Sequence, residues 1–344
     1  MKAIRIHEHG DVAKVQIDTV DDPWPRFGEV KIRIKASALN HMDLWVRDGI
    51  PGIGKLPLTL GCDGSGVVDT LGEGVTRFAK GDRVVLYPVL SCGHCSDCAR
   101  GLESHCTQMK LFGEHVDGTH AESISVPERN VLLMDDSISF EEAAAFPLVF
   151  LTAWHMLVYN AQVKPGEVVL VVGAGSGVGS AAIQIAKLHG AEVIATCGGT
   201  VKMGQAIALG ADHVIDHHQE DIAKRVREIT HKKGVDIVFE HVGVKVWESC
   251  LRSLAMNGRL VTCGATTGPL VNMDLRHVFI KQQKIIGSTM GSLSEMLLIN
   301  KFMAQKKLKP VISSVFPFTE VAQAQRYFEE SRHFGKVILS WHKA

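Results

Sequence analysis

Four cysteines stand close together in the chain and have the spacing of a metal site: Cys92, Cys95, Cys98 and Cys106. Four thiolates in the pattern C-x2-C-x2-C-x7-C can surround zinc tetrahedrally. An iron–sulfur cluster is the alternative, but its bacterial spacing ends with a three-residue gap and a proline. Here the last gap has seven residues and Thr107 follows. The spacing therefore predicts one structural zinc with no open catalytic position, and it places His94 and His105 at the surface.

A glycine-rich run follows the apolar segment 168–172 and precedes a segment with an apolar helical face. Between a strand and a helix, such a turn lets backbone N–H groups and a helix N-terminus meet a pyrophosphate. The spacing G-x-G-x-x-G is not met in any register, so the prediction of dinucleotide binding depends on the strand–turn–helix context. A tight turn without a ligand is the alternative. The turn consists of Gly173, Ala174, Gly175, Ser176, Gly177, Val178 and Gly179.

The next expected strand ends in a short segment that bears on the choice of nucleotide. Sites for NAD usually place Asp or Glu about 20 residues beyond the turn, where it holds the ribose 2′-hydroxyl. This segment has Cys197, Gly198, Thr200 and Lys202 there, and no acid. Thr200 and Lys202 offer a hydroxyl and a positive charge to a 2′-phosphate. We therefore expect NADP(H) to be favoured over NAD(H), with a solvated Lys202 as the simpler alternative.

A third group of polar residues lies on two loops that flank apolar strands. We expect it to be catalytic, although a cysteine among apolar residues is more often a core thiol and an aspartate in a loop more often a hydrogen-bond acceptor. The scattered Cys197, Cys250 and Cys263 are likewise expected to be small buried hydrophobic residues. The group consists of Asn40, His41, Asp43, Cys62 and Asp63.

The elements that must position these groups change character along the chain. Up to about residue 130, short alternating strands are cut by glycine turns, which indicates a mostly β region. After a capping-box sequence at 139–142, apolar strands alternate with amphipathic helices, which predicts a doubly wound parallel sheet. Expected strands are 168–172, 193–195, 235–239 and 259–262, and expected helices are 178–189, 201–209, 221–231 and 245–256. In the tail we expect helices at 294–305 and 320–331 and a strand at 336–339, packed on the first half.

Length and charge limit the class of protein. A chain of 344 residues is long enough for two domains. Lys plus Arg equals Asp plus Glu at 37 each, so neither nucleic acid nor an anionic membrane is the expected partner, and a small-molecule substrate is. Residues 1–8 alternate like a strand and not like a signal peptide, and the most apolar stretch, 143–158, is too short to span a bilayer. We expect a cytoplasmic protein.

These motifs occur in an order that resembles the medium-chain dehydrogenase/reductase superfamily, which includes zinc-type alcohol dehydrogenases and quinone oxidoreductases. The resemblance covers the N-terminal β region, loops 40–43 and 61–68, the cysteine lobe and the glycine turn. It implies a GroES-like catalytic domain, residues 1–150 and 288–344, that contains the zinc lobe 92–106. It also implies a Rossmann domain, residues 151–287, with the active site in the cleft, and a homodimer or homotetramer.

The chain departs from this pattern where zinc alcohol dehydrogenases hold a catalytic metal. The resemblance places their ligands, a cysteine, a His-Glu pair and a second cysteine, at Asn40, Cys62–Asp63 and Leu148. An amide is a poor zinc ligand and leucine is none. Cys62 and Asp63, with His41 nearby, remain capable of a nonstandard site. Asn40 at this position resembles the quinone oxidoreductases, which work without catalytic zinc.

The lost ligands bear on the reaction. Hydride added to an isolated ketone builds charge on one oxygen, which a metal normally stabilises. Hydride added to a conjugated double bond spreads the charge over an enolate, which donors such as Asn40 can hold. We therefore expect reduction of a quinone or an α,β-unsaturated carbonyl compound. A zinc-dependent alcohol dehydrogenase with unusual ligands is the alternative, and a non-catalytic nucleotide-binding protein is a third possibility that the surviving polar residues disfavour.

Overall fold

A computed structural model describes residues 1–341 of the chain. They form two compact units. The first runs from Met1 to Leu148 and resumes at Gly291, and the second is Val149–Met290. From the sequence, these junctions were expected at 150/151 and 287/288.

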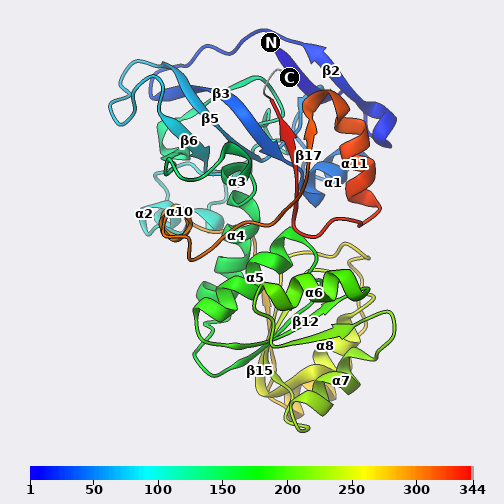
Figure 1. Ribbon diagram of the computed structural model, residues 1–344. Coiled ribbons are helices and arrows are strands. Elements are labelled where there is room, and N and C mark those ends of the chain that lie inside the picture. The colour runs from blue at the N-terminus through cyan, green and yellow to red at the C-terminus, as the bar shows by residue number, and fades with distance from the viewer. Residues whose placement is uncertain (342–344) are drawn as a thin grey trace. The chain divides into compact units, whose positions relative to one another are not determined.

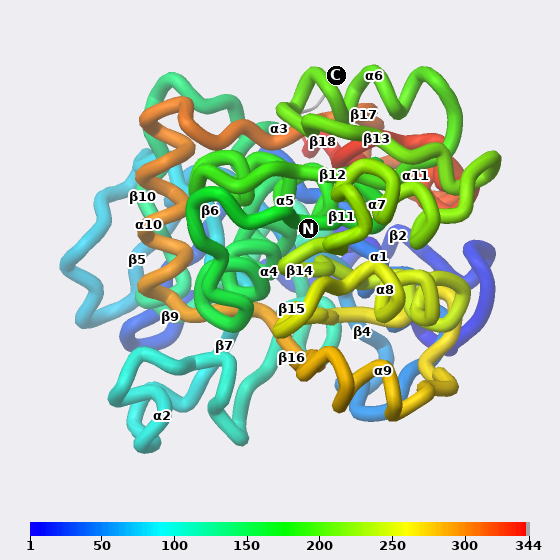
Figure 2. Tube along the Cα trace, turned by 90° about the horizontal axis from the view of Figure 1, so that it is seen from below, coloured from blue at the N-terminus to red at the C-terminus, as the bar shows by residue number. Residues whose placement is uncertain are grey.

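The second unit is built on one parallel sheet of six strands. Their order is β13-β12-β11-β14-β15-β16, as Figure 2 shows from one edge to the other. If the six strands are numbered along the chain, this order is 3-2-1-4-5-6, which is typical of a dinucleotide-binding fold. The order in which strands are added to the sheet reverses between β11 and β14. The doubly wound parallel sheet expected from the sequence is therefore confirmed. The strands are β11 (Val168–Val171), β12 (Glu192–Cys197), β13 (His213–Asp216), β14 (Val235–Glu240), β15 (Leu254–Thr262) and β16 (Lys284–Gly287).

Helices cover both faces of this sheet, with α5 on one face and α7 and α8 on the other (Figure 2). Both faces are therefore shielded from water, which is why the central strands are nearly continuous apolar runs. In β11, for example, Val169, Leu170 and Val171 are fully buried. The helices are α5 (Gly177–Leu188), α6 (Thr200–Ala208), α7 (Ile222–Ile229), α8 (Trp247–Ser253) and α9 (Leu275–Ile280).

Three details of this unit differ from the sequence prediction. The edge strands β13 and β16 were not expected, because each has one solvated side and lacks the apolar run of a central strand. Residues 254–256 were expected to end a helix. Instead Leu254 opens β15, where it pairs with Val235 of β14.

The first unit is mostly β, as expected. Its main sheet has the order β10-β6-β5-β3-β18-β17, with β9 also paired to β3, and a smaller sheet has the order β2-β1-β4. Figure 1 shows β3, β5 and β6 side by side. The strands are β1 (Lys2–Ile6), β2 (Val15–Thr19), β3 (Glu29–Ala38), β4 (Leu58–Thr59), β5 (Asp63–Leu71), β6 (Arg83–Leu86), β7 (Val89–Leu90), β8 (Lys110–Leu111), β9 (Ser123–Pro127), β10 (Val131–Leu133), β17 (Ile312–Pro317) and β18 (Lys336–Ser340).

Helices of the first unit connect these strands or cover them. The tail returns to this unit, since β18 pairs with β3 and α11 contacts both β17 and β18. The helices are α1 (His41–Asp48), α2 (Ser96–Ala99), α3 (Phe140–Ala144), α10 (Leu293–Ala304) and α11 (Val321–Glu329), with 3-10 turns η1 (Val12–Lys14), η2 (Glu103–His105), η3 (Glu128–Asn130) and η5 (Phe318–Glu320).

The apolar stretch 143–158 forms the end of α3, then α4 (Pro147–Trp154) and most of the π-helical segment η4 (His155–Asn160). Its side chains are mostly buried in the protein. Across residues 1–341, every helix is too short or too polar to cross a membrane.

The register of β3 fixes which loops meet at one end of the main sheet. Its last residue, Ala38, is paired with Asp63 at the start of β5 on one side. On the other side Ala38 is paired with Ile338 of β18. Both neighbours are antiparallel to β3, so the residues just beyond Ala38 lie beside the starts of β5 and β18.

The loop that precedes β5 is packed backbone against backbone. A Cβ atom added to Gly118 would lie 2.1 Å from the Gly61 carbonyl oxygen, and one added to Gly113 would lie 2.5 Å from it. Backbone atoms cannot move aside as a flexible side chain can, so a side chain at Gly118 has no space.

We predict that Gly118→Ala lowers the free energy of unfolding by about 1 to 3 kcal/mol, the usual cost of overpacking. Gly204→Ala is the matched control, because Gly204 lies within α6 with open space around its Cα, and alanine there should stabilise by about 0.5 to 1 kcal/mol. Urea unfolding followed by circular dichroism measures both. A Gly118→Ala variant as stable as the parent would show that this loop is not close-packed.

Candidate functional site

Three side chains meet at the end of β3, and two of them were expected from the sequence. Asn40, two residues beyond β3, donates from Nδ2 to Asp63 Oδ2 over 2.9 Å. The third is Lys336, the first residue of β18, whose Nζ donates to Asn40 Oδ1 and to Asp63 Oδ2, the latter at 3.1 Å. All three are at most 4% exposed. The result is a buried ion pair bridged by one amide, called here the Asn40–Asp63–Lys336 cluster.

Asp63 has a hydrogen bond at each carboxylate oxygen. Oδ2 accepts from Asn40 and Lys336, and Oδ1 accepts from the backbone N–H of Leu148 over 2.8 Å. Leu148 thus contributes its main chain, and its side chain has no ligand atom. These contacts stabilise a buried carboxylate that would otherwise be costly to desolvate.

The Asn40 amide has a fixed orientation. Its oxygen faces the Lys336 ammonium, so its nitrogen must face Asp63. One Nδ2 hydrogen is held by Asp63, while the other has only the Ala38 carbonyl at 3.5 Å, which is a weak contact. The Asn40 side chain therefore keeps one hydrogen that a stronger acceptor can take.

Asp43 lies in the first turn of α1 and serves the same loop. Its Oδ2 accepts from the Asn40 N–H over 2.7 Å, and its Oδ1 accepts from the Gly61 N–H over 3.0 Å. Burial raises the pKa of Asp43 to about 7, against the lowering effect of the Asn40 N–H and the Lys336 charge. Asp43 thus ties the loop at Asn40 to the loop that precedes Asp63.

His120 is fully buried beside this loop. Its Nδ1 lies 2.9 Å from the hydroxyl of Ser37, which itself accepts from Trp341 Nε1 over 2.8 Å. Its Nε2 lies 3.7 Å from Asp43 Oδ1, beyond hydrogen-bond distance. Burial and, second, the Lys336 charge lower the pKa of His120 to about 3, so the ring is neutral at pH 7.

The remaining two residues of the expected catalytic group lie apart from these contacts. Cys62 is fully buried, and burial together with the charges of Asp63 and Asp43 raises the pKa of its thiol well above the ordinary value. His41 is half-buried, and its ring lies edge-on against Phe328 of α11 at 4.8 Å.

The donor set does not fit a catalytic metal. Both Asp63 oxygens are already held, Lys336 adds a positive charge beside them, and Cys62 is held in its neutral thiol form. Within residues 1–341, the single group of three or more Cys, His, Asp or Glu ligand atoms close enough to share an ion is the four-cysteine lobe.

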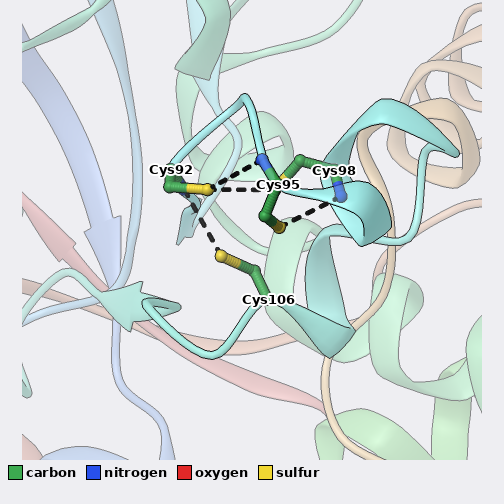
Figure 3. A group of neighbouring side chains, drawn as sticks. All are labelled: Cys92, Cys95, Cys98 and Cys106. Atoms are coloured by element: carbon green, nitrogen blue, oxygen red, sulfur yellow. Dashed lines mark hydrogen bonds between the residues drawn. The ribbon is translucent and has the colours of Figure 1, made fainter.

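The cysteine lobe does fit a tetrahedral metal ion. All four sulfur atoms lie within 4.8 Å of one another, and the side chains converge in Figure 3. A Zn–S distance of about 2.3 Å requires sulfurs about 3.8 Å apart in a tetrahedron, and Cys92 Sγ lies 3.8 Å from Cys98 Sγ. Backbone N–H groups of Cys95 and Cys98 also donate to the sulfurs of Cys92 and Cys95, which favours thiolates. His94 and His105 are exposed, as expected.

The glycine turn lies at the carboxyl end of β11, where the strand order reverses. Ser176 caps α5 by accepting from the Gly179 N–H over 2.9 Å. A Cβ on Gly179 would lie 2.3 Å from the Gly173 carbonyl oxygen, so only glycine allows the turn to close on the helix. The N–H groups of Gly177 and Val178 have no acceptor in the described part of the chain. They are the donors that an incoming phosphate needs.

The end of β12 and the segment after it lie beside β13, a strand that was not expected from the sequence. Cys197 is paired with Asp216 of β13, and a Cβ on Gly198 would lie 2.2 Å from the His218 ring. Burial, then the Asp216 charge, raises the pKa of Cys197 to about 11, and Lys202 opposes this shift. An acid is therefore present near the end of β12 after all, on the adjacent strand.

Both units of the chain match known protein families. Residues 26–136 match the family model of the alcohol dehydrogenase GroES-like domain, and residues 177–305 match that of the zinc-binding dehydrogenases. A quinone oxidoreductase of Salmonella typhimurium is 31% identical over 340 residues, which is 98% of this chain and 95% of that protein. The chain belongs to the medium-chain dehydrogenase/reductase superfamily. It is an NAD(P)-dependent oxidoreductase, which confirms the class predicted from the sequence and the GroES-like and Rossmann-type folds.

Other relatives differ in the reaction that they are named for. An acryloyl-coenzyme A reductase of Metallosphaera sedula is 31% identical over 344 residues, which is 99% of this chain and 100% of that protein. A crystal structure of an NAD-dependent alcohol dehydrogenase has 45% identity and a TM-score of 0.96, and covers 99% of this chain and 100% of that chain. The comparisons thus show the cofactor class and leave the substrate open.

Sequence reasoning missed two contributors, Lys336 and the backbone of Leu148. Lys336 was included only as the polar start of an apolar strand, 336–339. Its position is nevertheless a usable signal, because a lysine at the start of a buried strand needs a buried acid, and Asp63 at the start of β5 is one.

We predict that the purified protein carries one zinc ion per chain, and that Cys98→Ser lowers both the zinc content and the unfolding temperature. Metal ligation in a four-thiolate lobe is coupled to folding of the lobe. Cys250→Ser, a buried cysteine in the other unit, is the control that should keep its zinc. Elemental analysis that gives two zinc ions per chain, one of them lost on Cys62→Ala, would show that a catalytic metal is present.

Proposed function

We propose that this oxidoreductase reduces an activated carbon–carbon double bond, in a quinone or an α,β-unsaturated carbonyl compound, with NADPH as the preferred donor. The supporting observation is the Asn40–Asp63–Lys336 cluster, together with the Leu148 N–H. It fills with hydrogen bonds the positions at which the zinc-type alcohol dehydrogenases are expected to hold a catalytic metal.

The chemistry suits this arrangement. A reduced dinucleotide, its pyrophosphate held by the glycine turn, would supply the hydride that adds to the β-carbon. As that bond forms, the π electron pair would shift to the carbonyl oxygen to give an enolate, and a proton taken from solvent at the α-carbon would complete the reduction. The enolate charge is delocalised, so a hydrogen-bond donor is enough to hold it. We assign the weakly held Nδ2 hydrogen of Asn40 to that role.

The names of the relatives point to both reactions. The quinone oxidoreductase and the acryloyl-coenzyme A reductase are named for substrates with activated double bonds. An NAD-dependent alcohol dehydrogenase is similar over the whole chain as well. Alcohol oxidation with unusual metal ligands is therefore the alternative that an experiment must test.

We predict that enones and quinones are reduced faster than any simple alcohol is oxidised, and that Asn40→Ala lowers kcat by about 10² to 10³, as for the loss of one well-placed donor. Cofactor affinity should stay nearly constant, because Asn40 acts on the developing charge. The measurement is a panel of enones, quinones, aldehydes and alcohols assayed in both directions.

Two comparisons make this panel decisive. Asn300→Ala removes another amide of the same unit, one that donates to the Leu133 carbonyl, and should leave turnover unchanged. A chelator that spares the cysteine lobe should also have no effect. If alcohol oxidation leads the panel and disappears with the chelator, Cys62 and Asp63 hold a catalytic metal and the alcohol dehydrogenase alternative is correct.

The preference for NADP(H) has support from the residues around the end of β12. Lys202, in the first turn of α6, is close enough to influence both Cys197 and His217. Asp216 opposes the preference, although its Oδ1 accepts from the His218 N–H over 3.0 Å. We therefore propose a modest preference for the phosphorylated nucleotide.

We predict that Lys202→Met raises the Kd for NADPH by about three- to tenfold, the effect expected when one partly exposed charge-assisted hydrogen bond to the 2′-phosphate is lost. The Kd for NADH should be unchanged. Lys224→Met, an exposed lysine of α7, is the control. Fluorescence titration of both reduced nucleotides gives the four constants. Equal or tighter binding of NADH to the parent protein would contradict the assignment.

We also propose that the cysteine lobe holds a structural zinc and that the chain forms a homodimer or homotetramer. Strand β16 is an edge strand of the six-stranded sheet, so the backbone N–H and C=O groups on its outer side are available for pairing. Phe279 and Ile280, just before it, are 67% and 62% exposed, and Ile285 within it is 39% exposed. A second copy paired along β16 would satisfy the edge and cover these apolar side chains.

A further inference from the structure

Lys336 is a buried cation to which neither the sequence motifs nor the comparisons assign a role. Its side chain is 3% exposed, and it joins the two residues at which the catalytic machinery was expected, Asn40 and Asp63. Its charge also influences Asp43, Cys62 and His120, the other buried titratable groups around the loop. Lys336 is thus the common cation of the site.

The contact with Asn40 has two physical consequences. The ammonium donates to Oδ1, so the amide cannot rotate by 180° without placing its NH2 group against a positive charge. The same hydrogen bond draws electron density toward Oδ1 and makes the Nδ2 hydrogens stronger donors, because linked hydrogen bonds polarise one another. Both effects act on the hydrogen that Asn40 keeps weakly held toward Ala38.

We propose that Lys336 is a positioning residue of the active site, which orients and polarises the Asn40 amide so that it holds the negative charge formed on the substrate oxygen. In this site a fixed ammonium and its amide take the place of a metal ion. The role of Lys336 rests on the proposed function of Asn40. No bond to Lys336 forms or breaks in the reaction, and its proton stays on Nζ.

The test must separate a charge effect from loss of folding, since Lys336→Met alone leaves Asp63 buried without its cation. The double variant Asp63→Asn/Lys336→Met removes both charges and leaves no unpaired ion. Lys31→Met is the matched control, because Lys31 is another buried lysine of the main sheet, paired with Asp22 and Asp69. Lys31 lies on β3, outside the site.

For each protein, kcat, KM, the Kd of the reduced nucleotide and the unfolding temperature are measured. We expect Lys336→Met to lower kcat by about 10²-fold, comparable with the loss of a site donor, with the Kd unchanged. Lys31→Met should lower the unfolding temperature but keep kcat within about threefold, because Lys31 is distant from the Asn40–Asp63–Lys336 cluster and shares no partner with it. The double variant should regain stability but not kcat, since Asn40 still lacks the cation that orients it.

Three results would overturn the proposal: full kcat in Lys336→Met, recovery of kcat in the double variant, or an equal loss of kcat in Lys31→Met. All variants are assayed on the substrate class that the parent protein turns over fastest. A parent protein that oxidises alcohols contradicts the proposed function, whereas a kcat that follows stability alone contradicts the role of Lys336. The two failures are therefore distinguishable.

Discussion

A single strand register brings together the buried polar side chains of the first unit. Because β3 lies between β5 and β18, the loop after Ala38 meets an acid from one neighbour and a base from the other. Either charge alone would be strongly unfavourable there, since removing one partner of a buried pair typically costs about 3 to 5 kcal/mol. The ion pair therefore requires β18 to be in place, and with it the C-terminal part of the chain. The position of Asn40 depends on both strands.

The cysteine lobe and the Asn40–Asp63–Lys336 cluster differ in how far apart their members lie in the chain. The four cysteines fall within 15 residues and are brought together by local turns, so their spacing alone was enough to predict the lobe. Asn40 and Lys336 are 296 residues apart. No local pattern records that contact, because it follows from the order of strands in a sheet. The sequence could name Asn40 and Asp63 as candidate site residues, yet it could not show that their polar atoms are held by Lys336 and by a backbone N–H.

The second unit was easier to predict for a related reason. A parallel sheet covered on both faces imposes long apolar strands and amphipathic helices, and both patterns are visible in the sequence. The exceptions were β13 and β16, whose partly solvated side chains lack that pattern. The missed β13 also hid Asp216, which lies beside Cys197 only through strand pairing. The nucleotide preference is thus harder to read from the sequence than the nucleotide fold.

This difference explains why relatives that match the whole chain, at 31% to 45% identity, carry different names. Dinucleotide binding depends on backbone geometry, such as the close approach of Gly179 to the Gly173 carbonyl, and side-chain changes elsewhere in the unit leave that geometry intact. The reaction that we propose depends instead on a few side chains at strand ends. A cysteine at position 40 or 148 would offer a metal a thiolate, whereas Asn40 and Leu148 offer an amide and a backbone N–H. With Lys336 beside Asp63, a cation is already bonded into the protein, and a divalent ion would have to compete with it for the same carboxylate. Similarity over the whole chain therefore shows the cofactor class, NAD(P)(H), whereas the proposed stabilisation of charge on the substrate rests on three residues that meet at one end of β3.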